Sequence, residues 1–431
     1  MLVSDISRER QDDLVSLSAT YHWEDVDREP QRIFLRYGAH DSYFDDAALA
    51  MPFLIAAVVP ALRRGEQRIR VEGGAVCPWL LDNLATFMAY LTDWYWYKYD
   101  RHPRDKRIPR LEADTFAARR PGAARTACFF SGGVDSLYSL RRNRANLPLD
   151  SQGSVKDALF VHGFDMGTRP NRGTEENFFH SVIASMRPVL DSEQLNLIPV
   201  FTNIRDLDRD TDCWLDEYMG SAMSAVAHGL AGKLTDVLVA SSYEIRKLHP
   251  FSCHPMLEPR LSSYGLRVNH DGERLSRVER VRMVAQWPAA LQSLRVCFFG
   301  DDSRLNCGKC PKCIRTKLEL VCAGKLAEAV TLPGGEPSPQ EVREGLVIQH
   351  DTEAFMDTLE AGLREKDRHD LADAVRAARR RYVVSHARNP KGLLKHLDEK
   401  LLRGVIKRRW AARGARIVED NQGRQSTAAR R

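Results

Sequence analysis

A glycine-rich turn with the sequence Phe-Phe-Ser-Gly-Gly-Val-Asp-Ser-Leu spans residues 129–137, directly after a short apolar stretch. Paired glycines let several backbone N–H groups point at one anion, and the N-terminus of a following helix adds its dipole there. Ser131 and Ser136 can donate hydroxyl hydrogen bonds, and Asp135 suits a Mg²⁺ ion that bridges phosphate oxygens. These three polar side chains are our catalytic candidates, although no Walker A motif is present. The predicted phosphate-contacting residues are Ser131, Gly132, Gly133, Val134, Asp135 and Ser136.

A second group of residues that could do chemistry consists of cysteines in two overlapping C-x-x-C units, with a further cysteine ten residues upstream. Four thiolates at this spacing can bind one tetrahedral Zn²⁺, and an iron–sulfur cluster could use the same ligands. The sequence leaves the identity of the fourth ligand open. Cys297 fits best, and Cys322 and Cys253 are the alternatives. The predicted metal ligands are Cys297, Cys307, Cys310 and Cys313.

Several polar residues follow predicted strands, where ligands of parallel sheets bind. The serines could contact substrate or cap a loop, and the basic residues could neutralise phosphate or substrate charge. For the basic residues, surface charge or a packed histidine is the alternative. These candidates are Asp165, Ser241, Ser242, Arg246, Lys247 and His254.

Continuous apolar strands alternate with helical stretches through the middle of the chain. This alternation predicts an α/β fold, in which a parallel sheet is covered by helices on both faces. The predicted strands are residues 127–130, 158–161, 197–201, 237–240 and 294–299. The clearest predicted helices between them are residues 177–190 and 212–234.

The chain divides into three predicted regions. Residues 1–120 form an α+β unit with a basic linker, in which residues 32–37 and 68–72 are strand-like. Residues 121–330 carry the turn and the cysteines. Residues 331–431 are helical, with a capping box starting at Ser338 and a final dozen residues that we expect to be disordered.

Charge is spread unevenly over a chain whose net charge is +6. After Val375 there are 17 Lys and Arg against 4 Asp and Glu, whereas the preceding residues carry 47 against 54. This basic C-terminal segment indicates a nucleic-acid or protein partner, or else a solvated helical face. We predict no membrane span and no association with a membrane, because the longest apolar run, residues 47–62, contains two prolines and fits a buried helix. The N-terminus lacks a secretory pattern, so we expect a cytoplasmic protein with free or metal-bound thiols.

The turn and the cysteine run together resemble the QueC family of PP-loop ATP pyrophosphatases, the 7-cyano-7-deazaguanine synthases. The resemblance implies an adenine nucleotide alpha hydrolase-like (HUP-type) fold with a small zinc module, and binding of ATP, Mg²⁺ and Zn²⁺. Asp165 matches a family aspartate in an FDYGQ-like segment, whose tyrosine and glutamine are not matched here, and we count it with the residues of the turn as a predicted ATP-binding residue. Residues 1–120 and those after 330 lie outside the resemblance.

Family members adenylate a carboxylate with release of pyrophosphate, then form an amide and a nitrile with ammonia. Residues 241–250 and 252–255 depart from the family's substrate pocket, so the resemblance implies an adenylated carboxylate, such as a 7-deazapurine acid, more directly than a nitrile. Two alternatives stay open. One is a PP-loop enzyme that modifies tRNA or another nucleic acid. The other is a non-catalytic nucleotide-binding subunit of an antiphage defence system.

Overall fold

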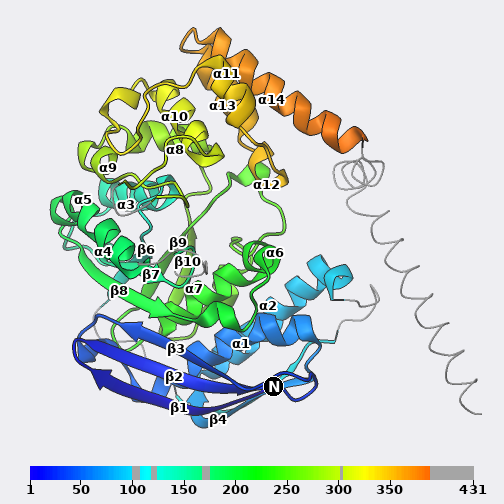
Figure 1. Cartoon of the computed structure of the whole chain (residues 1–431). Helices are drawn as coiled ribbons and strands as arrows, with labels where there is room; N and C mark the ends of the chain where they lie inside the picture. The colour runs from blue at the N-terminus through cyan, green and yellow to red at the C-terminus, as the bar shows by residue number, and fades with distance from the viewer. Residues whose placement is uncertain (100–106, 118–123, 167–174, 301–303, 389–431) are drawn as a thin grey trace, which may run out of the picture.

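The computed structural model describes residues 1–99, 107–117, 124–166, 175–300 and 304–388. Its centre is one ten-stranded sheet with helices on both faces, and the C-terminal helices lie at the end remote from the N-terminal strands (Figure 1). The predicted α/β class is therefore confirmed. The sheet order is β10-β9-β6-β7-β8-β3-β2-β1-β4-β5.

The five strands that carry the predicted site run parallel to one another, from β10 to β8. Four of the predicted strands correspond to β6, β7, β8 and β9, whereas β10 was not predicted. Parallel strands bring their carboxyl ends to one edge, which is where loops can converge on a ligand. The bounds are β6 Thr126–Phe129, β7 Val155–His162, β8 Asn196–Thr202, β9 Asp236–Ala240 and β10 Arg267–Asp271.

The strands of the first 120 residues extend the same sheet. β3 pairs antiparallel with β8 through Leu35 and Thr202, and β3, β2 and β1 are successive antiparallel neighbours. The predicted strands 32–37 and 68–72 fall within β3 and β4. The sequence analysis did not predict β1, β2 or β5. The bounds are β1 Leu2–Gln11, β2 Leu14–His22, β3 Gln31–Tyr37, β4 Arg68–Val76 and β5 Arg110–Thr115.

Alternate residues of β6 enter two different cores, which explains why the strand is apolar throughout. Ala127 and Phe129 pack in the core that contains α1, α2 and α7, while Cys128 belongs to the core with α3 to α5, α8 and α9. Burial of both faces removes the polar alternation of a half-exposed strand. The helix bounds are α1 Ala50–Arg64, α2 Pro78–Tyr95, α3 Val134–Asn146, α4 Glu175–Ser185, α5 Arg187–Ser192, α6 Thr211–Cys213, α7 Met219–His228, α8 Arg277–Val284 and α9 Pro288–Ser293.

One stretch among the described residues, Asp46–Arg64, is long and apolar enough to cross a membrane by length and composition. Within its most apolar window, 78% is buried inside the protein. This stretch includes α1, whose residues from Ala50 to Leu62 are all buried. The prediction of a buried helix here is confirmed.

Three predicted elements differ from the structure. The predicted helix 177–190 is divided at Met186 into α4 and α5. The predicted strand 294–299 is irregular backbone instead, and its polar groups bond to loops: Val296 N donates to Asn306 Oδ1 and Arg295 N donates to Gly132 O. The predicted helix 212–234 is divided. A π-helical turn at Trp214–Tyr218 separates α6 from α7. Such turns widen the helix, and they often occur at functional sites.

The C-terminal helices form a third apolar core together with α10. The predicted capping box is confirmed, because Ser338 Oγ accepts from Glu341 N and the Glu341 carboxylate accepts from Ser338 N. The predicted disordered tail lies outside the described residues. The bounds are α10 Pro311–Ala323, α11 Pro339–Gly345, α12 His350–Glu353, α13 Met356–Arg364 and α14 His369–Arg388.

Candidate functional site

The predicted phosphate-binding turn joins the end of β6 to the first residue of α3, Val134. Gly132 has φ of 72°, a backbone conformation that residues with a Cβ rarely adopt, so glycine is favoured there. Gly133 N donates to Ser131 Oγ at 3.3 Å, and Ser136 Oγ donates to Gly133 O at 3.0 Å. The structure thus shows the strand, tight turn and helix order that the motif needs.

Asp135 faces helix α8 and receives two guanidinium groups. Arg277 Nη1 donates to one carboxylate oxygen and Arg280 Nη1 to the other, each at 2.9 Å. Burial alone would raise the pKa of Asp135, but the two arginines outweigh it and hold the pKa below its usual range. The carboxylate is therefore ionised at neutral pH, and the arginines occupy the oxygens that we assigned to Mg²⁺.

A cavity of about 380 Å³ opens beside the turn and gathers the carboxyl ends of β6, β7 and β9. Its walls include Ser131, Gly133, Val134, Asp135 and Ser136 of the turn, together with Asp165 and Ser242. The structure therefore brings together, at one edge of the sheet, three segments that are far apart in the sequence.

Four cationic side chains line the same cavity. Arg295 Nη2 lies 3.2 Å from the Asp165 carboxylate, and its backbone N–H donates to Gly132 O in the turn. Burial lowers the pKa of Lys312 to about 8, and nearby Arg315 acts in the same direction. Asp135, Asp165 and Asp351 line the cavity as well, so its wall carries a small excess of positive charge, which favours an anionic ligand. The four cations are Arg277, Arg295, Lys312 and Arg315.

Another part of the cavity wall is apolar and aromatic. Trp214 and Leu215 come from the π-helical turn, and Phe164 packs against Trp214 with ring centroids 5.1 Å apart. The apolar and sulfur-containing side chains there give flat contact surfaces to a partly apolar ligand. This part also includes Met219, Met223, Phe251 and Cys253.

The C-terminal region contributes to the cavity, which the sequence analysis did not foresee. Asp351, Thr352 and Phe355 line it from α12 and the residue before α13. The Phe355 ring is stacked on Tyr243, with centroids 5.5 Å apart and planes within 8°. The Arg315 guanidinium carbon lies 4.8 Å from the centre of the same ring. Phe355 therefore bridges the β9 loop and the cationic wall.

The weaker substrate candidates divide into two groups. Ser242 lines the cavity, and buried Ser241 lies next to it, where its carbonyl accepts a hydrogen bond from Arg280. The other three do not line the cavity. Arg246 is exposed, Lys247 Nζ pairs with Asp357 at 2.6 Å, and His254 packs edge-on against Trp94.

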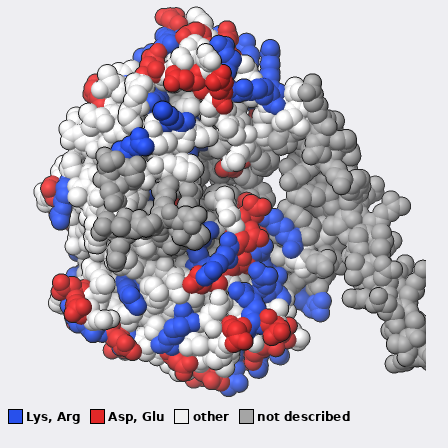
Figure 2. Space-filling model, viewed as in Figure 1, with Lys and Arg blue, Asp and Glu red and all other residues white. Residues whose placement is uncertain are grey.

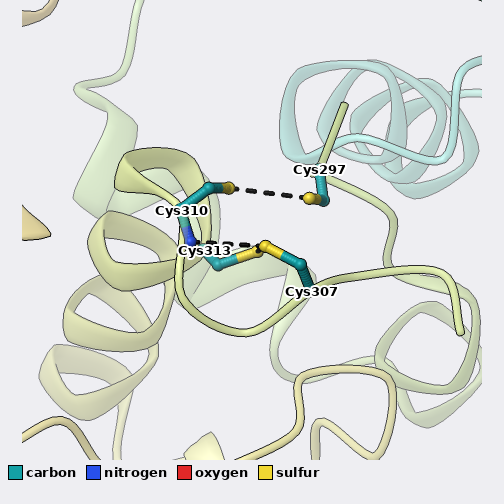
Figure 3. A group of neighbouring side chains, drawn as sticks. All are labelled: Cys297, Cys307, Cys310 and Cys313. Carbon is teal, nitrogen blue, oxygen red and sulfur yellow. Dashed lines mark hydrogen bonds between the residues drawn. The ribbon is translucent and has the colours of Figure 1, made fainter. Parts of the chain in front are cut away.

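The four predicted metal ligands converge, as Figure 3 shows. Their sulfur atoms all lie within 4.8 Å of one another, with Cys297 and Cys310 separated by 3.6 Å and Cys307 and Cys313 by 4.0 Å. Tetrahedral coordination at the usual zinc–sulfur bond length requires sulfur separations of about 3.8 Å. This donor set fits one metal ion, because a multi-iron cluster would hold the sulfurs further apart. The rival Cys322 instead lies against Leu359 O in the C-terminal core.

A buried asparagine holds the two cysteine segments together. Asn306 Oδ1 accepts from Val296 N and Cys297 N, and its Nδ2 donates to Leu294 O and Thr331 O. The side chain is fully buried, so these four bonds satisfy its amide completely. The position of Cys297 beside the C-x-x-C turns therefore depends on Asn306, which no metal motif in the sequence includes.

Figure 2 shows basic and acidic side chains interspersed on one face of the molecule, with no single-sign patch among the described residues visible there. The described start of the basic C-terminal segment is paired with acids. Arg376 Nε donates to Glu360 at 2.9 Å, and Arg379 Nη2 donates to Glu353 at 2.6 Å. The residues of this segment after 388 lie outside the described part of the chain.

We compared the chain with family models, with curated proteins and with solved structures. No family model, no curated protein and no solved structure matches it.

Proposed function

We propose that this chain is a QueC-like, ATP-dependent enzyme that adenylates a carboxylate and releases pyrophosphate. The observation that carries the proposal is the turn at Ser131–Ser136, which lines a cavity whose wall also holds four cations. Backbone N–H groups and a helix N-terminus suit phosphate oxygens, and the cations suit the charge that develops at the α-phosphate. An amine or ammonia would then displace AMP to give an amide. A nitrile would require a second ATP, which adenylates the amide oxygen so that this oxygen leaves with AMP.

Each part of the cavity has a role in this proposal. The turn and Arg295 hold the phosphates, with Asp165 orienting the Arg295 guanidinium. The aromatic wall around Trp214 positions the acyl substrate or the adenine base. Ser242, at the end of β9, offers a polar contact to the same ligand. The protein's contribution to catalysis is positioning and electrostatic stabilisation.

Two metals belong to the proposal. The four cysteines would hold Zn²⁺ in a structural role, because four thiolates leave no open coordination position. Mg²⁺ would neutralise the nucleotide phosphates. Asp135 is the carboxylate on the turn, and it would have to exchange an arginine hydrogen bond to bind the ion. The arginine pairs also give Asp135 a role that needs no metal, namely holding Arg277 and Arg280 beside the turn.

The test uses ATP labelled at the α-phosphate with ammonia and a panel of carboxylic acids that includes deazapurine acids. Formation of AMP that depends on one acid supports the enzyme. ATP binding without cleavage across the panel supports a nucleotide-binding subunit instead. Co-purified RNA that accelerates AMP formation, and that dissociates steeply as salt rises, would favour nucleic-acid modification. Failure to bind ATP would contradict all three.

A further inference from the structure

The first turn of α10 serves the cysteine cluster and the cavity at the same time. The helix begins at Pro311, directly after Cys310, and contains Cys313. Lys312 stands between these two metal ligands in the sequence, and it lines the cavity beside the phosphate-binding turn. Arg315, three residues further along, lines the cavity as well. The six residues from Cys310 to Arg315 therefore carry two predicted metal ligands and two cavity cations.

Lys312 differs from the other three cavity cations because each of those has a carboxylate within ion-pair distance. Arg277 pairs with Asp135 and Glu319, and Arg295 pairs with Asp165. Arg315 has Glu319 at 3.6 Å. Within the described part of the chain, the ion pairs include none for Lys312, and its Nζ lies 3.5 Å over the ring of Phe298. The carboxylates of Asp165 and Asp135 act on Lys312 electrostatically without forming an ion pair with it, so an anionic ligand would supply the direct charged contact that its ammonium group lacks.

The phosphate-binding turn supplies no lysine of its own, since residues 129–137 contain neither Lys nor Arg. A lysine is a compact point charge that can follow a phosphate oxygen without the planar geometry of arginine. The cation that a Walker A motif places at its loop could therefore come here from a different part of the chain.

We propose that Lys312 is the phosphate-reaching cation of the turn at Ser131–Ser136, delivered by the metal-binding segment; this rests on the proposed function. The cysteines fix the first turn of α10, and that turn sets where the Lys312 ammonium lies in the cavity. Metal binding at the cysteines is thereby linked to polyphosphate binding at the turn, through a single side chain.

A competing role for Lys312 is to offset the negative charge of four thiolates around a metal. Lys309 provides the matched control, because it lies in the other C-x-x-C turn, is exposed, and does not line the cavity. If a lysine mattered only for the charge of the metal centre, substitution at either position would weaken metal retention.

The experiment compares the metal-loaded full chain with its Lys312→Met, Lys312→Arg and Lys309→Met variants. Inorganic pyrophosphate and Mg·ATP are titrated calorimetrically, and bound metal is measured by elemental analysis. We expect Lys312→Met to weaken pyrophosphate binding roughly 10- to 100-fold, the range for a lost charge-assisted hydrogen bond, with unchanged metal content. Lys312→Arg should restore part of the affinity, and Lys309→Met should match the wild-type chain.

Each other outcome overturns the inference in a recognisable way. If Lys312→Met binds pyrophosphate as the wild type does, the lysine does not reach the phosphates, while the proposed function stands. If Lys312→Met loses metal in parallel with pyrophosphate affinity, Lys312 serves the metal centre. If the wild-type chain binds neither pyrophosphate nor Mg·ATP, the proposed function fails and this inference fails with it.

Discussion

Arg280 donates a hydrogen bond to Asp135 at 2.9 Å, and this contact ties helix α8 to the phosphate-binding turn. The arginine is fully buried, and it also donates to the carbonyls of Ser241, Tyr243 and Leu275. One guanidinium therefore links the turn after β6 to the loop after β9. The shape of the cavity depends on this link as much as on the glycines.

Replacing Arg280 by methionine should destabilise the protein strongly. The substitution leaves three carbonyls, two of them buried, without this donor and removes one of two cations from Asp135, so we expect a loss of about 3–5 kcal/mol in the free energy of unfolding. Urea denaturation would measure it. Arg282→Met is the control, because Arg282 is on the same helix but pairs with Glu365 on the surface. Equal stability of the two variants would show that the buried network contributes little.

Replacing Cys310 by serine should abolish metal binding and lower stability together. Three thiolates and a hydroxyl bind zinc less tightly, and without the ion the two C-x-x-C turns lose their common anchor. Cys322→Ser is the matched control, since Cys322 is a buried cysteine outside the cluster. Metal content and thermal unfolding of both variants decide the matter. A stable, metal-free Cys310→Ser chain would contradict a structural metal.

Truncating Phe355 to alanine should loosen the contact between the C-terminal region and the cavity. The stacked pair with Tyr243 contributes roughly 0.5–1.5 kcal/mol beyond its buried area, and two cavity arginines lie near the ring. We expect weaker binding of Mg·ATP or of the acyl substrate, with the metal content retained. Val347→Ala, at an exposed position of the same region, is the comparison. Identical ligand affinities would exclude a role for Phe355 at the cavity.

Acid should destabilise the protein through a buried histidine that the site does not use. Burial lowers the pKa of His228 to about 4, against a hydrogen bond to Ser224 O that acts the other way. The unfolded chain therefore takes up the proton first as pH falls, and stability decreases from about pH 6.5 to about pH 4. Each pKa unit corresponds to about 1.4 kcal/mol, so the shift is worth roughly 3 kcal/mol.

The variant His228→Leu should lose much of this pH dependence, because leucine cannot take up a proton. Urea midpoints measured across that pH range would show a flatter profile than in the wild type. His180→Leu changes an exposed histidine and should keep the wild-type profile. A steep acid profile that persists unchanged in His228→Leu would assign the effect to other groups.

The parts of the fold that the sequence predicted are those where local pattern and burial agree. The paired glycines within residues 129–137 predict a tight turn, and the spacing of the cysteines predicts that they lie close together. Strand β6 is recognisable because both of its faces are buried. The prediction of a strand at 294–299 was wrong. These apolar residues lie in a loop, and its backbone N–H groups bond to Asn306 and Gly132 instead of to a neighbouring strand.

The rest of the site depends on contacts that have no local signature. Arg277 and Arg280 lie on an ordinary capped helix far along the chain from Asp135, and only the packing of α8 on α3 brings them to the turn. Phe355 enters the cavity from the C-terminal core in the same way. The basic residues Lys312 and Arg315 stand beside the cysteines in the sequence, but the sequence does not show that their side chains line the cavity.

The central claim is that this cavity cleaves ATP between its α- and β-phosphates. The most direct measurement follows ATP labelled at the α-phosphate with the wild-type chain and with Ser136→Ala, in the presence of Mg²⁺, ammonia as the nucleophile and an acid panel. We predict acid-dependent AMP from the wild type and a loss of at least about tenfold in the variant, which lacks a hydroxyl of the turn. The absence of AMP with every acid, or equal AMP from both proteins, would contradict the account.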